Sequence, residues 1–329
     1  MLKRLLIAFI LIFIAFFGWF FLATRPVTYK PTSTSDFEIK SGWSIDRIGQ
    51  ELSNDKLIRS RAAFKITIVT LGIGNKIQAG FFKLAPNMSL TDIARSLTHA
   101  TIKQVRVTIP EGLRREEIGL IIDNSFKNIE GKSFSVTEFM QETQGKEGTL
   151  FPDTYDFDPK ATTSAIVSRL ENRYKEIITQ ANIKETDQNR VTTLASLLQR
   201  EAATTAEMPE VAGVIENRLK AKWPLQIDAT VQYAIASGRC KNINCSWWPN
   251  NLTSTDLQIK SPYNTYLNQG LPPMPICNPG ADAIKAAASP KATTAWFYLH
   301  DLNGQIHFAA TIEEHNKNVC VYLHKSCPN

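Results

Sequence analysis

The centre of the predicted fold is the helical stretch Leu194-Ala195-Ser196-Leu197-Leu198-Gln199-Arg200-Glu201-Ala202. On an α-helix Leu194, Leu197 and Leu198 share one face, and this spacing predicts that the face packs into a core. Glu201 lies at the edge of the same apolar stripe, so we expect its carboxyl group to be partly removed from water. Because desolvation disfavours a carboxylate, this position predicts a raised pKa for Glu201 and an acid that can donate a proton near neutral pH. The alternative is an ordinary solvated or helix-capping glutamate.

Regular elements are predicted on both sides of this stretch. Apolar spacing indicates a helix from Ser164 to Ala181 and a longer helical region that begins near Gln188. Beyond Pro224 the chain is expected to be irregular, because repeated prolines break the periodicity, and such loops often line a binding cleft. The chain then ends in two predicted strands, Trp296 to His300 and Ile306 to Ala310, joined as a hairpin.

A strand, a turn and a helix follow one another three times in the first part of the chain. The strands begin at Phe37, Phe81 and Val105, and each is followed by a helix with apolar residues at helical spacing. The first two of these units, around a further helix from Arg61 to Val69, resemble a LysM-like module, a small α/β fold that grips N-acetylglucosamine polymers. The alternative is a spacer domain without affinity for sugars.

The N-terminal stretch has the length and composition of a membrane span. No residue from Leu5 to Ala23 is charged, and at about 1.5 Å per residue this stretch approaches the roughly 30 Å hydrocarbon core of a bilayer. A cleavable signal peptide has a shorter apolar region and a small-x-small cleavage site, which Leu22 to Pro26 matches poorly. Lys3 and Arg4 precede the span, which favours a cytoplasmic N-terminus and an extracytoplasmic remainder, although Arg25 weighs against it.

Composition and charge narrow the possible partners only slightly. The hydrophobic fraction of 43% and the charged fraction of 21% are ordinary for a globular protein. The net charge of +6 is spread over scattered lysines and arginines, and no helix carries a basic stripe with interleaved aromatics. Nucleic acid is therefore not an expected partner. A mildly basic ectodomain suits an anionic envelope polymer or a membrane surface.

Five cysteines lie in the last third of the chain: Cys240, Cys245, Cys277, Cys320 and Cys327. In an oxidising exterior four of them can pair. We expect Cys240 to bond to Cys245 and two of the other three to bond to each other, although connectivity does not follow from sequence. The alternative is a zinc site with His300, His307 or His315, but the spacings match no zinc motif.

Several separate segments carry a resemblance to a known family. They are Pro110-Glu111-Gly112, Glu147-Gly148-Thr149-Leu150-Phe151-Pro152-Asp153-Thr154-Tyr155, Ala195-Ser196-Leu197-Leu198-Gln199-Arg200-Glu201, Val211-Ala212-Gly213-Val214-Ile215-Glu216-Asn217-Arg218-Leu219, Leu225-Gln226-Ile227-Asp228-Ala229-Thr230-Val231, Ser261-Pro262-Tyr263-Asn264-Thr265-Tyr266, Gly270-Leu271-Pro272-Pro273 and Asn278-Pro279-Gly280. In this order, from about residue 105 to 315, the chain resembles the endolytic murein lytic transglycosylases of the MltG (YceG-like) family. An N-terminal anchor and a LysM-like module are also features of that family.

The resemblance implies that Glu201 is the catalytic acid, because it matches the last position of the family's Ala-Ser-x-x-(Glu/Gln)-x-Glu pattern. Many relatives carry a second glutamate two residues earlier, where this chain has Gln199. A hydrolase generally needs a second carboxylate, whereas in a lytic transglycosylase the C6 hydroxyl of muramic acid attacks the anomeric carbon. Glu201 would protonate the glycosidic oxygen and then accept the proton of that hydroxyl, which leaves a 1,6-anhydromuramoyl end.

The matching loops also contain polar residues that we expect to position the sugar: Gln226, Asp228, Asn264 and Tyr266. Structural alternatives are a turn cap for Asp228, a backbone-bonding loop residue for Asn264 and a half-buried core residue for Tyr266. The adjacent Trp247 and Trp248 could stack on sugar rings or cover the core.

The predicted architecture is α+β: an N-terminal transmembrane helix, a small LysM-like α/β module and a mixed α+β catalytic domain with a Pro-rich cleft. The expected boundaries are a cytoplasmic tail at residues 1–4, a signal anchor at 5–23, a linker at 24–36, the module at 37–103 and the catalytic domain at 104–329.

The implied activity is endolytic cleavage of the MurNAc-GlcNAc bond within nascent glycan strands, a step that would end their elongation. No metal or organic cofactor is implied. The expected partners are peptidoglycan strands, the cell membrane and, through the resemblance, peptidoglycan synthases. Two other functions stay open: a muramidase-type hydrolase with Asp228 or Glu216 as the second carboxylate, and a non-catalytic glycan-binding scaffold.

Overall fold

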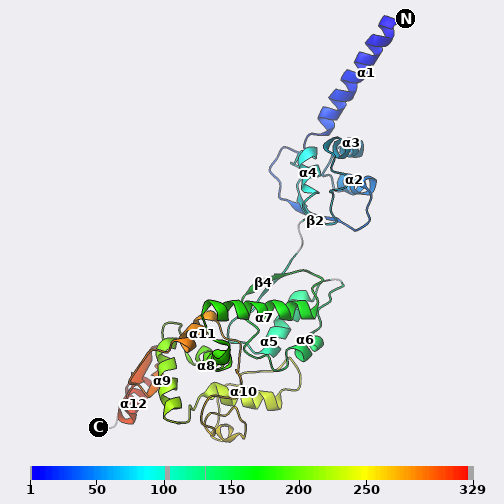
Figure 1. Ribbon diagram of the computed structural model, residues 1–329. Helices are drawn as coiled ribbons and strands as arrows, with labels where there is room; N and C mark the ends of the chain where they lie inside the picture. The colour runs from blue at the N-terminus through cyan, green and yellow to red at the C-terminus, as the bar shows by residue number, and fades with distance from the viewer. Residues whose placement is uncertain (1, 101–103, 130, 325–329) are drawn as a thin grey trace. The chain divides into compact units, whose positions relative to one another are not determined.

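The computed structural model of the chain describes residues 2–100, 104–129 and 131–324 (Figure 1). These residues form helices and two-stranded sheets, in agreement with the predicted α+β class. They divide into two compact units, Met1–Gln104 and Val105–Asn329, here called unit 1 and unit 2. Four positions named in the predictions lie outside the described residues: residue 1 of the tail, residue 103 at the end of the module, Cys327, and residue 329 at the end of the catalytic domain.

Unit 1 contains a two-stranded sheet and three short helices that follow the long helix α1 (Leu2–Ala23). Their bounds are β1 (Ser35–Ile39), α2 (Ile45–Asn54), α3 (Arg61–Leu71), β2 (Gly80–Leu84) and α4 (Leu90–Ser96). β1 and β2 pair antiparallel with Phe37 opposite Phe82, and both side chains are buried. Each short helix follows a serine whose Oγ accepts the N–H three residues on, which satisfies a donor at the helix start.

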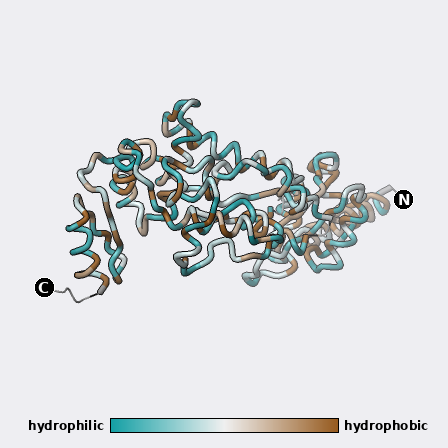
Figure 2. The backbone as a smooth tube through the Cα atoms, turned by 90° about the horizontal axis from the view of Figure 1, so that it is seen from below, coloured by the Kyte–Doolittle hydropathy of each residue, from teal (hydrophilic) through white to brown (hydrophobic). Residues whose placement is uncertain are grey.

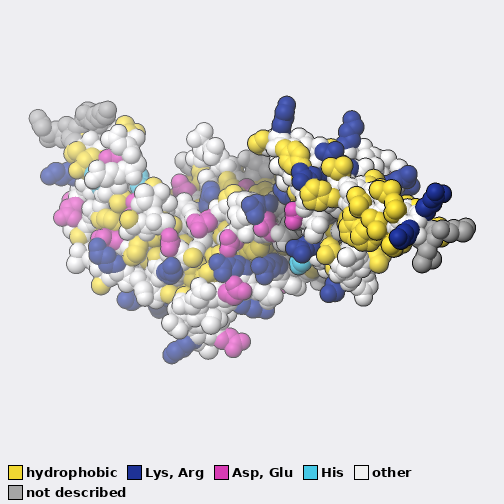
Figure 3. All heavy atoms as spheres, turned by 90° about the horizontal axis from the view of Figure 1, so that it is seen from above, with side chains coloured by type: hydrophobic (Ala, Val, Ile, Leu, Met, Phe, Trp, Pro, Cys, Tyr) yellow, Lys and Arg dark blue, Asp and Glu magenta, His cyan; other side chains and the backbone are white. Residues whose placement is uncertain are grey.

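α1 is long and apolar enough to cross a bilayer, judged by its length and composition from Lys3 to Ala23. Its large apolar side chains between Leu5 and Leu22 are mostly exposed, and Figure 3 shows hydrophobic side chains gathered on this helix. At the end of the helix, Phe20 and Ala23 pack against the core of unit 1. An N-terminal apolar helix is thus present where the sequence predicts one.

The first part of unit 2 repeats the strand-helix-helix-strand order of unit 1. Its elements are β3 (Val105–Thr108), α5 (Arg115–Phe126), α6 (Val136–Glu142) and β4 (Thr154–Phe157), followed by α7 (Thr163–Gln180). β3 and β4 pair antiparallel. Apolar residues of these elements, including Val107, Ile122 and Leu170, form one core. This core fixes the loops before α5 and β4, which carry Arg114 and Glu147.

α8 (Gln188–Glu201) is the central helix of the second part of unit 2. It packs against α9 (Met208–Lys220), α10 (Asp228–Arg239) and α11 (Ala281–Ala288) (Figure 1). Leu194, Leu197 and Leu198 are fully buried, which confirms the predicted apolar face. Glu201 is the last residue of this helix.

The prediction that the chain beyond Pro224 is irregular is wrong in part, because α10 and α11 lie in this region. The prolines flank these helices instead of interrupting them. Pro224 precedes α10, and Pro279 precedes Gly280, the N-cap residue of α11. Between the two helices, residues 241–280 are mainly loops and turns.

A hairpin and a short helix follow. β5 (Phe297–His300) and β6 (Ile306–Ala309) pair antiparallel, each one residue shorter than predicted, and α12 (Ile312–Asn318) packs against both. Figures 1 and 2 show the hairpin and α12 together at the C-terminal edge of unit 2. Short helical turns also occur at Glu185–Asp187, Asp256–Gln258 and Val319–His324.

The described cysteines agree with the expected pairing of Cys240 with Cys245. Cys240 and Cys245 form a disulfide in the loop after α10. Cys277 is a buried free thiol, and Cys320 is disulfide-bonded.

Candidate active site

Glu201 lies in a pocket of 380 Å³ at the end of α8, here called the Glu201 pocket. Its walls consist of Glu201, Arg218, Gln226, Asp228, Tyr266, Phe297, Tyr298, Ile312 and His315. These residues come from the ends of α8 and α9, the segment that leads into α10, a loop before α11, and the hairpin with α12. The pocket therefore exists only where distant parts of unit 2 meet. No proline is among these wall residues, so the described structure does not place the predicted Pro-rich cleft at Glu201.

The surroundings of Glu201 favour its protonated form. Burial of the carboxyl group raises the pKa of Glu201 above its usual value, and the negative charge of Asp228 raises it further. The hydroxyl of Tyr298 donates a 2.7 Å hydrogen bond to Oε2 of Glu201, which acts in the opposite direction. Glu201 also ends α8, where the negative pole of the helix disfavours a further negative charge. The net result is a raised pKa, the direction expected from the sequence.

Three of the four predicted sugar-positioning residues line the Glu201 pocket. Gln226 has a left-handed backbone with φ of 54°, and its N–H donates to the carbonyl of Thr265. Asp228 is the first residue of α10, and its Oδ1 accepts a 2.6 Å hydrogen bond from the hydroxyl of Tyr266. These two bonds tie the segment before α10 to the loop that carries Tyr266, so the polar groups are held together at one wall.

Asn264 lies outside the Glu201 pocket and is fully buried. Its side-chain nitrogen donates to the carbonyls of Leu257 and Ile259, each at 2.9 Å, and its Oδ1 accepts the N–H of Tyr266. The amide is thus used inside its own loop, in the backbone-bonding role that the sequence left as an alternative. It shapes the turn that presents Tyr266.

Sequence reasoning missed Tyr298 and Arg218. The Arg218 guanidinium donates from Nε to the carbonyl of Trp296 over 2.9 Å and from Nη1 to the carbonyl of Leu225 over 2.7 Å. It therefore links the hairpin to the segment before α10 and lies between two walls of the pocket. Burial lowers the pKa of Arg218, but a guanidinium stays charged in proteins. Tyr298 lies in a predicted strand, and strand alternation does not reveal which distant helix end its hydroxyl reaches.

His315 is a further wall residue that the sequence left unassigned to this site. Its ring stacks on Phe297 with 5.1 Å between centroids. Burial, with the nearby positive charge of Arg218, lowers the pKa of His315 below its usual value. A neutral imidazole therefore borders the pocket at neutral pH.

Gln199 and Glu216, which the sequence also raised as relevant to catalysis, bond to residues outside the Glu201 pocket. Oε1 of Gln199 accepts the N–H of Gly280 at 2.9 Å, which helps to hold the start of α11. Glu216 forms a 2.5 Å ion pair with Arg190 and lines a separate pocket. Asp228 is thus the carboxylate that shares the Glu201 pocket. Among the described residues, no group of three His, Cys, Asp or Glu side chains is placed to hold a metal ion.

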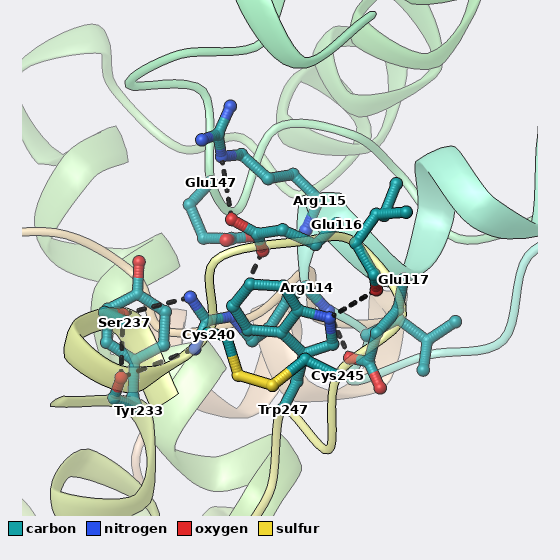
Figure 4. A network of polar contacts seen from close by, with 12 residues as sticks. Arg114, Arg115, Glu116, Glu117, Glu147, Tyr233, Ser237, Cys240, Cys245 and Trp247 are labelled. Atoms are coloured by element: carbon teal, nitrogen blue, oxygen red, sulfur yellow. Dashed lines mark hydrogen bonds and ion pairs between the residues drawn. A yellow bond between two sulfur atoms is a disulfide. The ribbon is translucent and has the colours of Figure 1, made fainter. Parts of the chain in front are cut away.

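A second pocket of 500 Å³, here called the Arg114 pocket, contains a dense polar network (Figure 4). The Arg114 side chain is 2% exposed, and it donates to Oε2 of Glu116 and to the hydroxyl of Ser237. Its guanidinium also lies over the rings of Tyr233 and Trp247, at 4.1 and 4.5 Å from their centroids. The buried cation is therefore stabilised by an ion pair, a hydrogen bond and two aromatic rings.

The disulfide loop forms one wall of this pocket. Trp247 is buried, and Trp248 lies over the guanidinium of Arg200 and donates its indole N–H to Glu117 over 3.0 Å. Figure 4 shows the Cys240–Cys245 bond beside Trp247. Both tryptophans thus serve the packing role that the sequence left open beside sugar stacking.

Glu147 is a second glutamate with a raised pKa. Its Oε1 accepts the N–H of Arg115 at 3.0 Å and the amide of Asn278 at 2.7 Å, whereas its buried Oε2 has no hydrogen-bond partner among the described residues. Burial, with the charge of Glu116, raises the pKa of Glu147 to about 8 in spite of the attraction of Arg114. Glu147 is therefore a neutral hydrogen-bonding group at neutral pH.

Comparison with known proteins identifies similar sequences over most of the chain. The YceG-like family matches residues 37–320. An endolytic murein transglycosylase of Bacillus subtilis (strain 168) is 34% identical over 326 residues, which cover 89% of this chain and 86% of that protein. An endolytic murein transglycosylase of Streptococcus pneumoniae serotype 2 is 24% identical over 87% of this chain, which spans only 58% of that relative.

A solved structure is also similar. The crystal structure of a yceG-like protein from Listeria monocytogenes superposes with a TM-score of 0.52 at 26% identity. The similarity covers 87% of this chain and 99% of the Listeria chain.

Proposed function

This chain belongs to the YceG-like family, and from that premise we propose that it is an endolytic peptidoglycan lytic transglycosylase with Glu201 as its acid. The observation that carries the assignment of the acid is the raised pKa of Glu201 in a pocket that is open to a substrate. The substrate is the glycan backbone of peptidoglycan, and the bond cleaved joins MurNAc to GlcNAc. Cleavage inside nascent strands would end their elongation.

The proposed reaction uses one carboxyl group twice. Protonated Glu201 donates its proton to the glycosidic oxygen, and the bond from that oxygen to C1 of MurNAc breaks. The C6 hydroxyl of the same MurNAc forms the new bond to C1, and the Glu201 carboxylate accepts its proton. Water does not enter the product, which ends in 1,6-anhydromuramic acid. The hydrogen bond from Tyr298 supports this cycle because it stabilises the carboxylate that forms after the first transfer.

The other polar wall residues are suited to hold the sugar. The Asp228–Tyr266 pair and the exposed Gln226 offer acceptors and donors for sugar hydroxyls. The cationic Arg218 suits the oxygen-rich substrate. The prolines contribute to the Glu201 pocket only through their neighbours, since the segment that follows Pro262 supplies Tyr266. Asn264 contributes by shaping that segment.

The rest of the chain fits an enzyme held near the membrane. α1 would anchor the protein with its N-terminus in the cytoplasm and the chain after Ala23 outside, which matches the charge pattern of Lys3 and Arg4. The strand-helix-helix-strand order of unit 1, residues 35–84, suits a LysM-like module that grips glycan. Association with peptidoglycan synthases would place the enzyme where strands emerge.

The decisive experiment is mass spectrometry of the soluble products after the full chain, in detergent, meets uncrosslinked glycan strands. Wild-type protein should release fragments with anhydromuramoyl ends, and Glu201→Gln should release none. Reducing ends would instead support a muramidase with Asp228 as its second carboxylate. Strand binding without cleavage by the wild type would favour a non-catalytic scaffold.

A further inference from the structure

An apolar groove lies beside the Glu201 pocket at the C-terminal hairpin. It has a volume of 460 Å³, and its walls consist of Ala221, Trp223, Trp296, Phe297, Ala310, Thr311, Ile312 and Glu313. Phe297 and Ile312 also line the Glu201 pocket, so the two cavities are adjacent. This groove is here called the aromatic groove.

Trp223 supplies the largest exposed aromatic surface of the groove. It follows α9 in a tight turn in which its N–H donates to the carbonyl of Arg218 over 2.8 Å. Its ring meets those of Trp296 and Phe297 edge to face, at centroid distances of 5.3 and 5.8 Å. These contacts fix the ring, yet 43% of Trp223 remains exposed. Ile312, on the other side, is 46% exposed.

Large apolar side chains held rigidly at the surface are typical of binding sites. A sugar ring has an apolar face of C–H groups and a rim of hydroxyls, so it suits an aromatic face with polar groups nearby. The groove offers both, since Thr311 and Glu313 lie among its walls. A glycan strand that is cut in its interior must also extend beyond the sugar at Glu201.

We propose that the aromatic groove is a glycan subsite that holds a sugar ring of the strand next to the one at Glu201, with Trp223 as its stacking platform. The proposal rests on the proposed function for the identity of the strand. Trp223 acts here as a positioning residue: it fixes the strand on the enzyme and takes no part in proton transfer. Its contribution should therefore appear in binding and in KM.

Binding to a catalytically silent protein tests the groove separately from the reaction. Full-length Glu201→Gln protein in detergent is titrated with uncrosslinked glycan strands and with the disaccharide GlcNAc-MurNAc, alone and with a second substitution. Trp223→Ala should raise the Kd for strands about tenfold, the size expected for loss of one aromatic contact. The Kd for the disaccharide should not change, because the Glu201 pocket can hold it alone.

Two variants control this comparison. Trp223→Phe keeps an aromatic face and should recover most of the strand affinity, which excludes misfolding as the cause of a loss. Leu302→Ala removes an apolar side chain that is 69% exposed on the same hairpin but outside the groove, and it should have no effect. In the active enzyme, Trp223→Ala should raise KM for strands and leave kcat nearly unchanged.

Each outcome separates the two proposals. Unchanged strand affinity in Trp223→Ala overturns the subsite while anhydro products still support the enzyme. Strand binding no tighter than disaccharide binding also overturns it. If the wild type does not cleave strands but Trp223→Ala still loses strand affinity, the subsite proposal is supported and the lyase proposal is overturned.

Discussion

The Glu201 pocket and the Arg114 pocket each hold a glutamate whose pKa is raised by burial. They differ in the groups that surround the carboxyl. Around Glu201 these are the hydroxyl of Tyr298 and the carboxylate of Asp228, beside open space. Around Glu147 they are backbone and amide donors within a network of arginines, and its Oε2 is sealed from solvent.

Under the proposed function, this difference separates an acid that can react from one that supports the fold. Desolvation acts on both groups in the same direction, so a raised pKa alone does not identify a catalytic residue. Access to substrate and a partner that stabilises the deprotonated form are also needed. Glu201 has both, whereas Glu147 is held by bonds to Arg115 and Asn278 that join separate loops of unit 2.

The largest expected effect is on turnover. Glu201→Gln should reduce kcat by about 10³-fold, within the usual range for loss of a general acid-base group. Glu147→Gln should leave kcat within a few-fold of the wild type, since it keeps the size of the side chain and the acceptor for Asn278. Rates of strand cleavage for both variants give the test. Equal losses in the two variants would remove the distinction between the pockets.

The second expected effect is the pH dependence of stability, and it concerns Glu147. Its pKa is about 8 in the folded chain and near the ordinary 4.5 when unfolded. The contribution of protonated Glu147 to the free energy of unfolding is therefore fully present below about pH 4.5. It is lost as pH rises toward 8, and the loss is on the order of several kcal/mol. Glu147→Gln should remove this loss.

Chemical unfolding of wild-type and Glu147→Gln proteins from pH 4.5 to 8.5 measures the difference. The two free energies of unfolding should diverge as pH rises, with the variant the more stable above pH 7. Parallel curves across this window would mean that Glu147 is ionised in the folded chain.

A third, smaller effect concerns the loop at the Arg114 pocket. Breaking the Cys240–Cys245 bond, which closes a short loop of sequence separation 5, should lower the free energy of unfolding by about 2 kcal/mol. Cys240→Ser alone and the double variant with Cys245→Ser should behave alike, because either removes the same bond. Denaturant unfolding measures the loss, and kcat should be unchanged. A fall in kcat would instead mean that the loop at the Arg114 pocket influences the Glu201 pocket.

The smallest expected effect is a pair of opposite shifts in the pH profile of cleavage. In the proposed reaction Glu201 must be protonated, so activity should fall as pH rises through the pKa of this group. Tyr298→Phe removes a bond that lowers this pKa, and the fall should move to higher pH, with kcat reduced about tenfold. Asp228→Asn removes a charge that raises it, and the fall should move to lower pH. Shifts of both variants in one direction would contradict this account.

Local patterns in the sequence predicted many elements of the fold. The spacing of Leu194, Leu197 and Leu198 predicted a buried helix face, because residues three and four apart lie on one side of a helix. The apolar N-terminus predicted α1, and the two terminal strands were placed to within one residue. α10 was missed because the prolines around it suggested loops, although they lie outside the helix.

The sequence by itself determined the candidate acid, its position at the edge of an apolar stripe and the direction of its pKa. Tertiary structure alone decided its neighbours. Tyr298 is 97 residues from Glu201 along the chain, and Tyr266 is 38 residues from Asp228. Such pairs depend on how separate elements pack, and side-chain periodicity carries no information beyond its own element. The same limit explains why Glu147 and Glu201 differ in their surroundings, since desolvation and hydrogen-bond partners arise only when distant segments meet.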